Sequence, residues 1–159
     1  MKKGISMLTL GLTIIILVIV TSVVVVSSKT VISSTIKKSF AEEMYSIKNL
    51  VEDYEFKHEE YPVKDTVITF DLSSISSENV DQFSEENAVN NEIKLYEIDL
   101  ARVGVDSVNV GNGKTSYDIY AYSLDTNNIY YLKGKKISDK LYYTLTDELY
   151  YQIGISEVK

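Results

Sequence analysis

One short segment of this chain resembles a phosphate-binding loop. Asn112-Gly113-Lys114-Thr115 matches the end of the pattern G-x-x-x-x-G-K-[ST], in which backbone N–H groups and the lysine hold phosphates. The pattern requires an earlier glycine at position 108, which is Val108, and a helix after the lysine, whereas residues 116–123 have a strand-like composition. We therefore interpret the segment as a flexible loop that enters a strand, and not as a nucleotide site.

A second group could supply hard oxygen ligands for a cation. Asp125 and Asn127, followed by Asn128, carry the carboxylate and amide oxygens that Ca²⁺ prefers. The same residue types are favoured in tight turns, because their side chains bond to the nearby backbone. We favour the turn, keep Asp125 and Asn127 as the candidate calcium ligands, and expect no other cofactor. The remaining acids of this region are interpreted as solvated charges: Asp139, Asp147 and Glu148.

Catalytic groups are sparse. His58 is the only histidine and lies in a charged stretch, so we expect it to be exposed. The acidic pairs Glu42-Glu43 and Glu85-Glu86 are interpreted as products of an acidic composition. Without a nucleophile–base arrangement, a metal-ligand cluster or a complete cofactor motif, we do not expect an enzyme; an apolar pocket with converging polar groups would argue for one.

The most informative segment lies near the N-terminus. Lys2, Lys3 and Gly4 precede an apolar run, Ile5 to Val26, that contains no charged residue. A bilayer needs roughly 20 apolar residues, so residues 5–28 are expected to form a transmembrane helix. An ordinary secretory signal has a shorter apolar core and a cleavage site after it. Here the candidate cleavage residue, Gly4, comes before the run, which would therefore stay in the mature protein.

A basic stub, a glycine and a retained hydrophobic helix resemble the N-terminus of type IV pilins and pseudopilins. In that family a prepilin peptidase cuts after the glycine on the cytoplasmic side and usually methylates the new N-terminus. The resemblance implies a leader over residues 1–4, cleavage between Gly4 and Ile5, and N-methylation of Ile5. Most members carry a glutamate at the fifth mature position, which is Thr9 here. Its loss is typical of minor pilins, so the resemblance implies a minor subunit.

The resemblance also implies a structural function and a set of partners. These are other pilin-like subunits, the prepilin peptidase, and an inner-membrane assembly platform with its ATPase. Apolar helices would pack together in the filament core, where Gly11 and Thr13 would allow close approach. Some pseudopilins bind calcium in a C-terminal loop. Secretion, DNA uptake, adhesion and motility all stay open as the task of the filament.

Other interpretations of the N-terminal segment stay open. The chain could be a single-pass, membrane-anchored extracytoplasmic binding module that is not assembled into a filament, or its apolar run could be a secretory signal cleaved near Ser27–Ser28. Lysines before the run and a formal net charge of -7 favour a cytoplasmic N-terminus and an external body, in the envelope or at the cell surface. The acidic charge argues against nucleic-acid binding, and the lack of cysteine excludes disulfides.

The helix is expected to continue beyond the membrane segment as an amphipathic helix over residues 29–57. Apolar residues recur every three or four positions and would share one face: Ile32, Ile36, Phe40, Met44, Ile47, Leu50 or Val51, and Tyr54. Residues before proline disfavour helix, so the helix, expected over about Ile5 to Phe56, must end before Tyr61-Pro62.

Residues 58–159 are expected to form a C-terminal globular, β-rich domain. Aromatic and β-branched runs predict strands at Thr66–Leu72, Tyr117–Ser123, Ile129–Lys133, Lys140–Leu145 and, as a possible further strand, Leu149–Ile153. Short helical turns are expected around Ser77–Phe83 and Asp99–Val103, with chain turns at residues 125–128 and Gly134. The expected fold class is α+β: a long N-terminal helix, hydrophobic in its first half, packed on a small antiparallel β-meander in a pilin-like fold.

Tyrosine is abundant in the β-region. Adjacent pairs such as Tyr130-Tyr131 must point to opposite faces of a sheet. One member can pack against the helix while the other faces outward. The tyrosines are interpreted as core and cross-strand packing, with an outward face for a neighbouring subunit, a glycan or an exported protein as the functional alternative.

Overall fold

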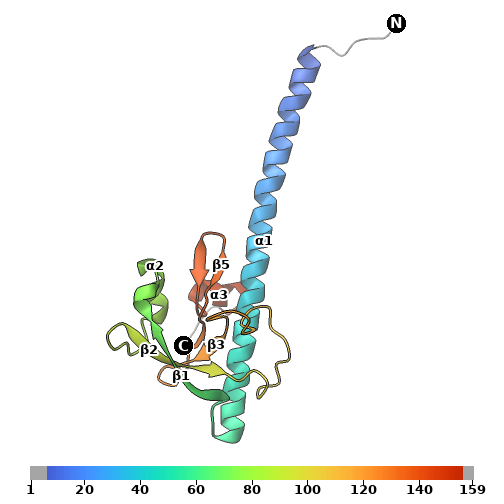
Figure 1. The fold of residues 1–159 in the computed structure, drawn as a ribbon. Coiled ribbons are helices and arrows are strands. Elements are labelled where there is room, and N and C mark those ends of the chain that lie inside the picture. The colour runs from blue at the N-terminus through green and yellow to red at the C-terminus, as the bar shows by residue number, and fades with distance from the viewer. Residues whose placement is uncertain (1–6, 156–159) are drawn as a thin grey trace. The chain divides into compact units, whose positions relative to one another are not determined.

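The computed structural model describes residues 7–155, and of the side chains up to residue 29 it describes only those of residues 14, 15, 17 and 18. The chain divides into two compact units, residues 1–35 and 36–159. Helix α1 (Met7–His58) belongs to both of them, and the sheets belong to the second (Figure 1). The chain is therefore α+β, with a long N-terminal helix and a small antiparallel sheet, as expected.

The end of α1 follows from local backbone chemistry. No proline interrupts its 52 residues. The next residue, Glu59, adopts a φ of 55°, which a helix cannot accommodate. Lys57 and His58 lie in the last turn, where cations interact favourably with the helix dipole. The helix extends two residues beyond the expected end at Phe56.

Within the second unit, one face of α1 enters the core. The buried positions are spaced by four, three and four residues, as one helical face requires: Phe40, Met44, Ile47 and Val51. The sequence pattern left either Leu50 or Val51 on this face, and it is Val51 that is buried. The expected stripe starts too early, because Ile32 and Ile36 are 57% and 39% exposed.

The main sheet has four antiparallel strands in the order β1-β2-β3-β4. They are β1 (Val63–Asp71), β2 (Glu92–Ile98), β3 (Tyr120–Tyr122) and β4 (Ile129–Tyr131). The register runs from Val67 opposite Tyr96 to Asp71 opposite Glu92 between the first two strands, with a bulge before Val67. An antiparallel sheet was expected, but only β3 and β4 of the predicted meander belong to it, both shorter than their expected ranges, and β2 was not predicted.

Smaller elements complete the second unit. The helical turns α2 (Ser77–Val80) and η2 (Asp81–Phe83) confirm the turn expected around Ser77–Phe83, and η1 (Leu72–Ser74) precedes them. Residues 99–104 form consecutive turns rather than a helix, ending at Gly104 with a φ of 75°. Strands β5 (Lys135–Ile137) and β6 (Lys140–Tyr142) form a separate hairpin, so residues 140–145 do not extend the meander.

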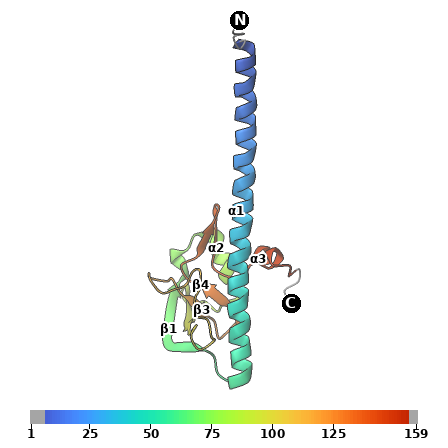
Figure 2. The same cartoon turned by 90° about the vertical axis from the view of Figure 1, so that its right-hand side faces the viewer.

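The possible strand at Leu149–Ile153 is wrong, because α3 (Asp147–Gln152) is a helix that lies beside α1 (Figure 2). Its first turn carries Asp147 and Glu148, which favour a helix N-terminus. Leu149 and Tyr150 are both buried, which suits a helix and not the alternating faces of a strand.

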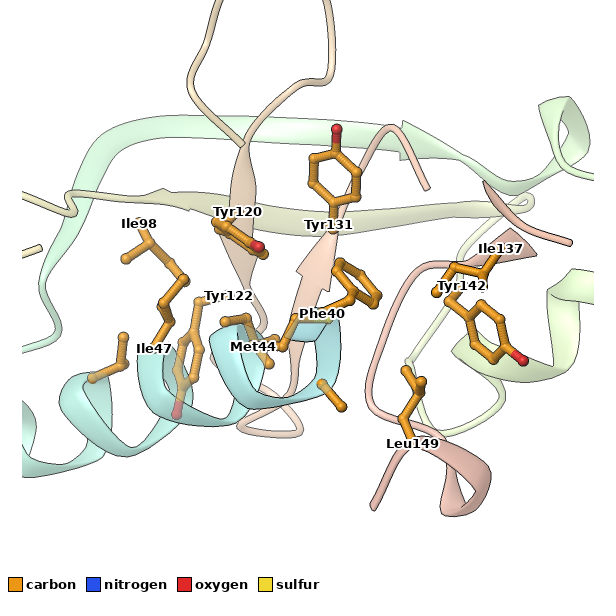
Figure 3. Packing of buried hydrophobic residues seen from close by; sticks show 13 residues of the cluster. Phe40, Met44, Ile47, Ile98, Tyr120, Tyr122, Tyr131, Ile137, Tyr142 and Leu149 are labelled. Atoms are coloured by element: carbon orange, nitrogen blue, oxygen red, sulfur yellow. The ribbon is translucent and has the colours of Figure 1, made fainter. Parts of the chain in front are cut away.

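At β3 and β4 the sheet is buried on both faces, whereas most of β1 is exposed. Tyr120, Tyr122 and Tyr131 pack with Phe40, Met44 and Ile47 of α1 on one face (Figure 3). On the other face, Tyr130 joins a second cluster and stacks on Phe83 of η2, with ring centroids 4.8 Å apart. Adjacent tyrosines do point to opposite faces, but both are covered. An outward tyrosine face on this sheet is therefore wrong, and the packing interpretation is confirmed for these residues.

Candidate functional surfaces

The residues implied by the pilin resemblance lie at the start of the chain. Gly4 and Ile5 lie outside the described residues. Thr9, Gly11 and Thr13 lie within helix α1, where the structure describes their backbone but not their side chains.

Apolar side chains of α1 are exposed where the structure describes them near the N-terminus. Ile14, Ile15, Leu17 and Val18 are between 54% and 64% exposed. At about 100° per residue these four positions span close to half of the helix circumference, which is wider than a coiled-coil seam. Further along, Val31 is 65% exposed. An apolar face of this width is the kind that a helix usually buries against other groups.

Within the described residues, no helix combines the length and the apolar character that a membrane span requires. Most side chains of the run Ile5–Val26 lie outside that description.

The candidate calcium ligands lie in the turn that joins β3 and β4. Asn127 adopts a φ of 57°, and its N–H donates to the carbonyl of Ser123 at 3.0 Å. Across residues 7–155, no group of three or more acidic or histidine side chains is placed to hold a metal ion. The backbone of Asn127 and its bond to Ser123 place Asp125 and Asn127 in a tight turn, which their residue types favour.

The backbone N–H groups of the phosphate-loop segment donate hydrogen bonds within the loop itself. Gly113 N–H donates to the carbonyl of Asp118 at 2.7 Å, and Lys114 N–H donates to the side chain of Asn112 at 3.2 Å. No helix follows within residues 115–119. The interpretation as a loop is confirmed. His58 is exposed, as expected, and its ring lies 4.2 Å from the ring of Tyr54.

Buried tyrosine hydroxyls are bound by carboxylates throughout the second unit. Each of four tyrosines donates to one acid at 2.6–2.8 Å, and the pairs are Tyr120–Glu43, Tyr130–Glu86, Tyr131–Asp118 and Tyr142–Glu148. Burial, and then the neighbouring carboxylate, raises the pKa of all four tyrosines, which keeps them as neutral donors. The acids thus satisfy polar groups that would be costly to bury alone.

Glu43 has the largest role of these acids. Its carboxylate accepts a hydrogen bond from Tyr120 Oη at 2.6 Å. It also accepts bonds from the backbone N–H and the side-chain amide of Asn109, both at 2.7 Å, and a weaker one from the N–H of Val110 at 3.4 Å. It therefore attaches the long β2–β3 loop to α1. Glu86 acts similarly for the β3–β4 hairpin, where it accepts the hydroxyls of Ser123 and Thr126. Interpreting these acids as products of composition was wrong.

Glu148 on α3 binds two lysines besides Tyr142. It forms ion pairs with Lys37 of α1 and with Lys140 of β6, the latter at 2.9 Å. The hydrogen bond from Lys37, then that from Lys140, lowers the pKa of Glu148 to about 2. The same contact raises the pKa of Lys37. Interpreting Glu148 as a merely solvated charge was wrong, because it links three elements.

This linkage predicts a pH dependence. Because the folded pKa of Glu148 lies below its ordinary value of 4.5, its stabilisation is complete above that value and is lost as pH falls toward 2. At neutral pH, Glu148→Gln is expected to cost about 1 kcal/mol, since a side chain more than a third exposed is screened by water. Urea unfolding in detergent at several pH values measures this.

The matched control for this experiment is Asp147→Asn, an exposed neighbour on the same helix that forms no ion pair among the described residues. It removes only the charge–dipole interaction of Asp147 at the start of α3, so it should cost about 0.5 kcal/mol or less and keep the loss of stability between pH 4.5 and 2. A deficit in Glu148→Gln that persists undiminished at pH 2 would contradict the assignment.

A groove of about 700 Å³ is lined mainly by the β2–β3 loop and the ends of the strands that it joins. Its charged lining is mixed in sign: Lys64, Glu97, Asp99, Asp106 and Lys114. Lys64 and Glu97 pair with each other. This lining is polar rather than an apolar pocket with a few converging polar groups.

Comparisons with known protein families, curated proteins and solved structures find no match to this chain. The functional conclusion must therefore come from the residues themselves.

Proposed function

We propose that this chain is a minor structural subunit of a type IV pilus-like or type II secretion-like filament, processed by a prepilin peptidase. The observation that carries the proposal is the exposed apolar surface of α1 at Ile14, Ile15, Leu17 and Val18, inside the uncharged run Ile5–Val26. Lys2, Lys3 and Gly4 stand directly before that run.

The exposed surface needs a covering for energetic reasons. Burying an aliphatic side chain of this size is favourable by roughly 1.5–3 kcal/mol, so several exposed together strongly favour transfer into lipid or association with like helices. A filament subunit uses both environments in turn. It is held in the bilayer first, with the lysines in the cytoplasm, and is then drawn by the platform and its ATPase into a bundle of apolar helices.

The rest of the chain is compatible with this role. We propose that the helix and the small antiparallel sheet form a pilin-like fold, which the α+β architecture supports. Thr9 stands where most relatives in that family would carry a glutamate, so this subunit brings no buried carboxylate into the apolar core. The missing glutamate supports the assignment as a minor subunit, because its loss is typical of minor pilins in the family that the N-terminus resembles.

Prepilin processing tests the proposal directly. The intact mass of the protein from membranes of its own host is compared with that of a Gly4→Val variant. We expect loss of Met1–Gly4, with or without an added methyl group, in the parent alone. A parent with an uncut N-terminus, in cells that contain the peptidase, would sink the filament proposal and favour a membrane-anchored binding module.

A further inference from the structure

The β5–β6 hairpin concentrates positive charge on an acidic chain. Residues 133–140, here named the lysine hairpin, contain four lysines and one acid: Lys133, Lys135, Lys136, Lys140 and Asp139. Lys140 pairs with Glu148, but neither Lys135 nor Lys136 forms an ion pair with any described residue. Lys136 is exposed, whereas Lys135 is half-buried on the face of β5 that carries the buried Ile137, so the hairpin offers two cations without an ion-pair partner in the described part of the chain, from opposite faces of this strand.

The end of α1 carries the opposite charge. Glu52, Glu55 and Phe56 are spaced by three and four residues and so share one side of the helix, and Glu59 follows just after its end. These four residues are named the acidic face. Phe56 is 84% exposed. Glu55 and Glu59 have no ion-pair partner within residues 7–155, and Glu52 is 4.0 Å from Lys48.

The two surfaces lie too far apart to meet within one chain. Lys37 of α1 lies 5.8 Å from the ring of Tyr142, which pairs with Lys135 in the hairpin, so Lys37 marks the level of the hairpin on the helix. The helix from Lys37 to Glu55 is about 27 Å long at 1.5 Å per residue. Both positions belong to the second unit. A contact between the two surfaces must therefore join different copies.

We propose that the lysine hairpin of one copy binds the acidic face of a second copy, head to tail. Because adjacent strand residues point to opposite faces, Lys135 and Lys136 reach the second copy from the two faces of the β5 edge strand and pair with Glu55 and Glu59. The exposed ring of Phe56 offers its face to a lysine cation. Such pairing also offsets the repulsion between copies that a charge of -7 would otherwise cause. This inference rests on the proposed function, because it describes a contact between neighbouring filament subunits.

The geometry makes a specific demand on assembly. Two copies could exchange both contacts only as an antiparallel pair, which subunits that share one membrane orientation cannot form, so each contact adds a further copy. Heterologous contacts of this kind repeat from copy to copy and generate open helical arrays. Cross-linking should therefore give a ladder of oligomers and not a dimer alone.

Cysteine cross-linking tests the contact cleanly, because the chain contains no cysteine. Lys136→Cys combined with Phe56→Cys in the full chain, oxidised in membranes of its own host, is expected to give the ladder. Each single variant should stay monomeric. Lys94→Cys with Phe56→Cys is the matched control, because Lys94 is an exposed lysine on β2. It should give no ladder.

Charge reversal tests the chemistry. Adding Lys135→Glu to the cysteine pair should reduce the ladder at least about tenfold, since like charges then face each other. Adding Glu55→Lys as well should restore it. A ladder whose intensity is unchanged by Lys135→Glu would overturn the proposal. Disulfide-linked dimers from a single-cysteine variant would overturn it too. Intact mass in the same samples separates the two hypotheses: cleaved chains without a ladder overturn this contact alone, whereas uncleaved chains overturn the filament.

Discussion

Glu43→Gln is expected to lose about 2–3 kcal/mol of folding free energy and to release the loop between β2 and β3. One carboxylate oxygen of Glu43 accepts two hydrogen bonds from Asn109, from its backbone N–H and its side-chain amide. The other oxygen accepts one from the Tyr120 hydroxyl and one from the Val110 N–H. A glutamine has one acceptor oxygen. If that oxygen serves Asn109, the amide NH₂ faces the N–H of Val110 and Tyr120 Oη, which must change from donor to acceptor; if it serves Tyr120, the NH₂ faces both donors of Asn109. Each buried donor left without an acceptor costs about 1–3 kcal/mol.

The release can be measured at individual amides. Hydrogen exchange at Asn109 and Val110 should accelerate in the variant. Gly111 reports whether the loop is lost as a whole, since its N–H donates to Asp118 at 2.9 Å and does not depend on Glu43 directly. Urea unfolding in detergent gives the accompanying change in stability.

Glu42→Gln is the matched control. Glu42 is the adjacent residue on α1, but its side chain is 57% exposed and lies 3.8 Å from Lys38 in a surface pair. Such pairs contribute little, so less than about 0.5 kcal/mol should be lost. Equal losses for the two variants would show that charge, and not the hydrogen bonds of Glu43, matters at this turn of the helix.

The position of Glu43 illustrates what sequence reasoning could not reach. The helix was predictable because its signals are local: no proline interrupts it, apolar residues recur every three or four positions, and Tyr61-Pro62 follows it. The partner of Glu43 is Tyr120, 77 residues away. Nothing in local spacing distinguishes Glu43 from Glu42, although one is a structural acceptor and the other is a surface charge.

The missed strand had a readable signal. In β2, Glu92-Ile93-Lys94-Leu95 alternates charged and apolar residues, and Ile93 and Leu95 are both buried. Alternation of this kind is the usual mark of a half-buried strand. The polar stretch directly before it, rich in Ser, Asn and Glu, gives this part of the chain a loop-like composition. This strand was therefore within reach of sequence reasoning.

The covered tyrosine face had no such signal. The expectation that Tyr130 and Tyr131 would point to opposite faces was correct, since adjacent strand residues must alternate. What covers it is Phe83, contributed by the short η2 turn far away in the chain. Period-two alternation predicts which faces residues take but not how many faces a small sheet buries. The candidate functional surface, in contrast, was visible directly as the uncharged run Ile5–Val26.

Gly111→Ala is expected to destabilise the fold by about 2–5 kcal/mol. Gly111 has a φ of 75°, where an alanine is strained by roughly 1–2 kcal/mol. A Cβ atom there would also lie 2.6 Å and 2.7 Å from two ring carbons of Tyr120. That ring is 1% exposed and its hydroxyl is bound to Glu43, so it cannot move aside without breaking the attachment of the loop. Overpacking of this kind adds about 1–3 kcal/mol.

Gly113→Ala separates the two causes. Gly113 has nearly the same φ, 72°, but a Cβ there would meet no atom within 4 Å. It should therefore lose only the part due to backbone strain, and the difference between the variants in urea unfolding measures the clash with Tyr120. If the two alanines cost the same, the Tyr120 ring yields freely. The bond from Tyr120 to Glu43 would then be too weak to hold the loop, which would also contradict the loss expected for Glu43→Gln.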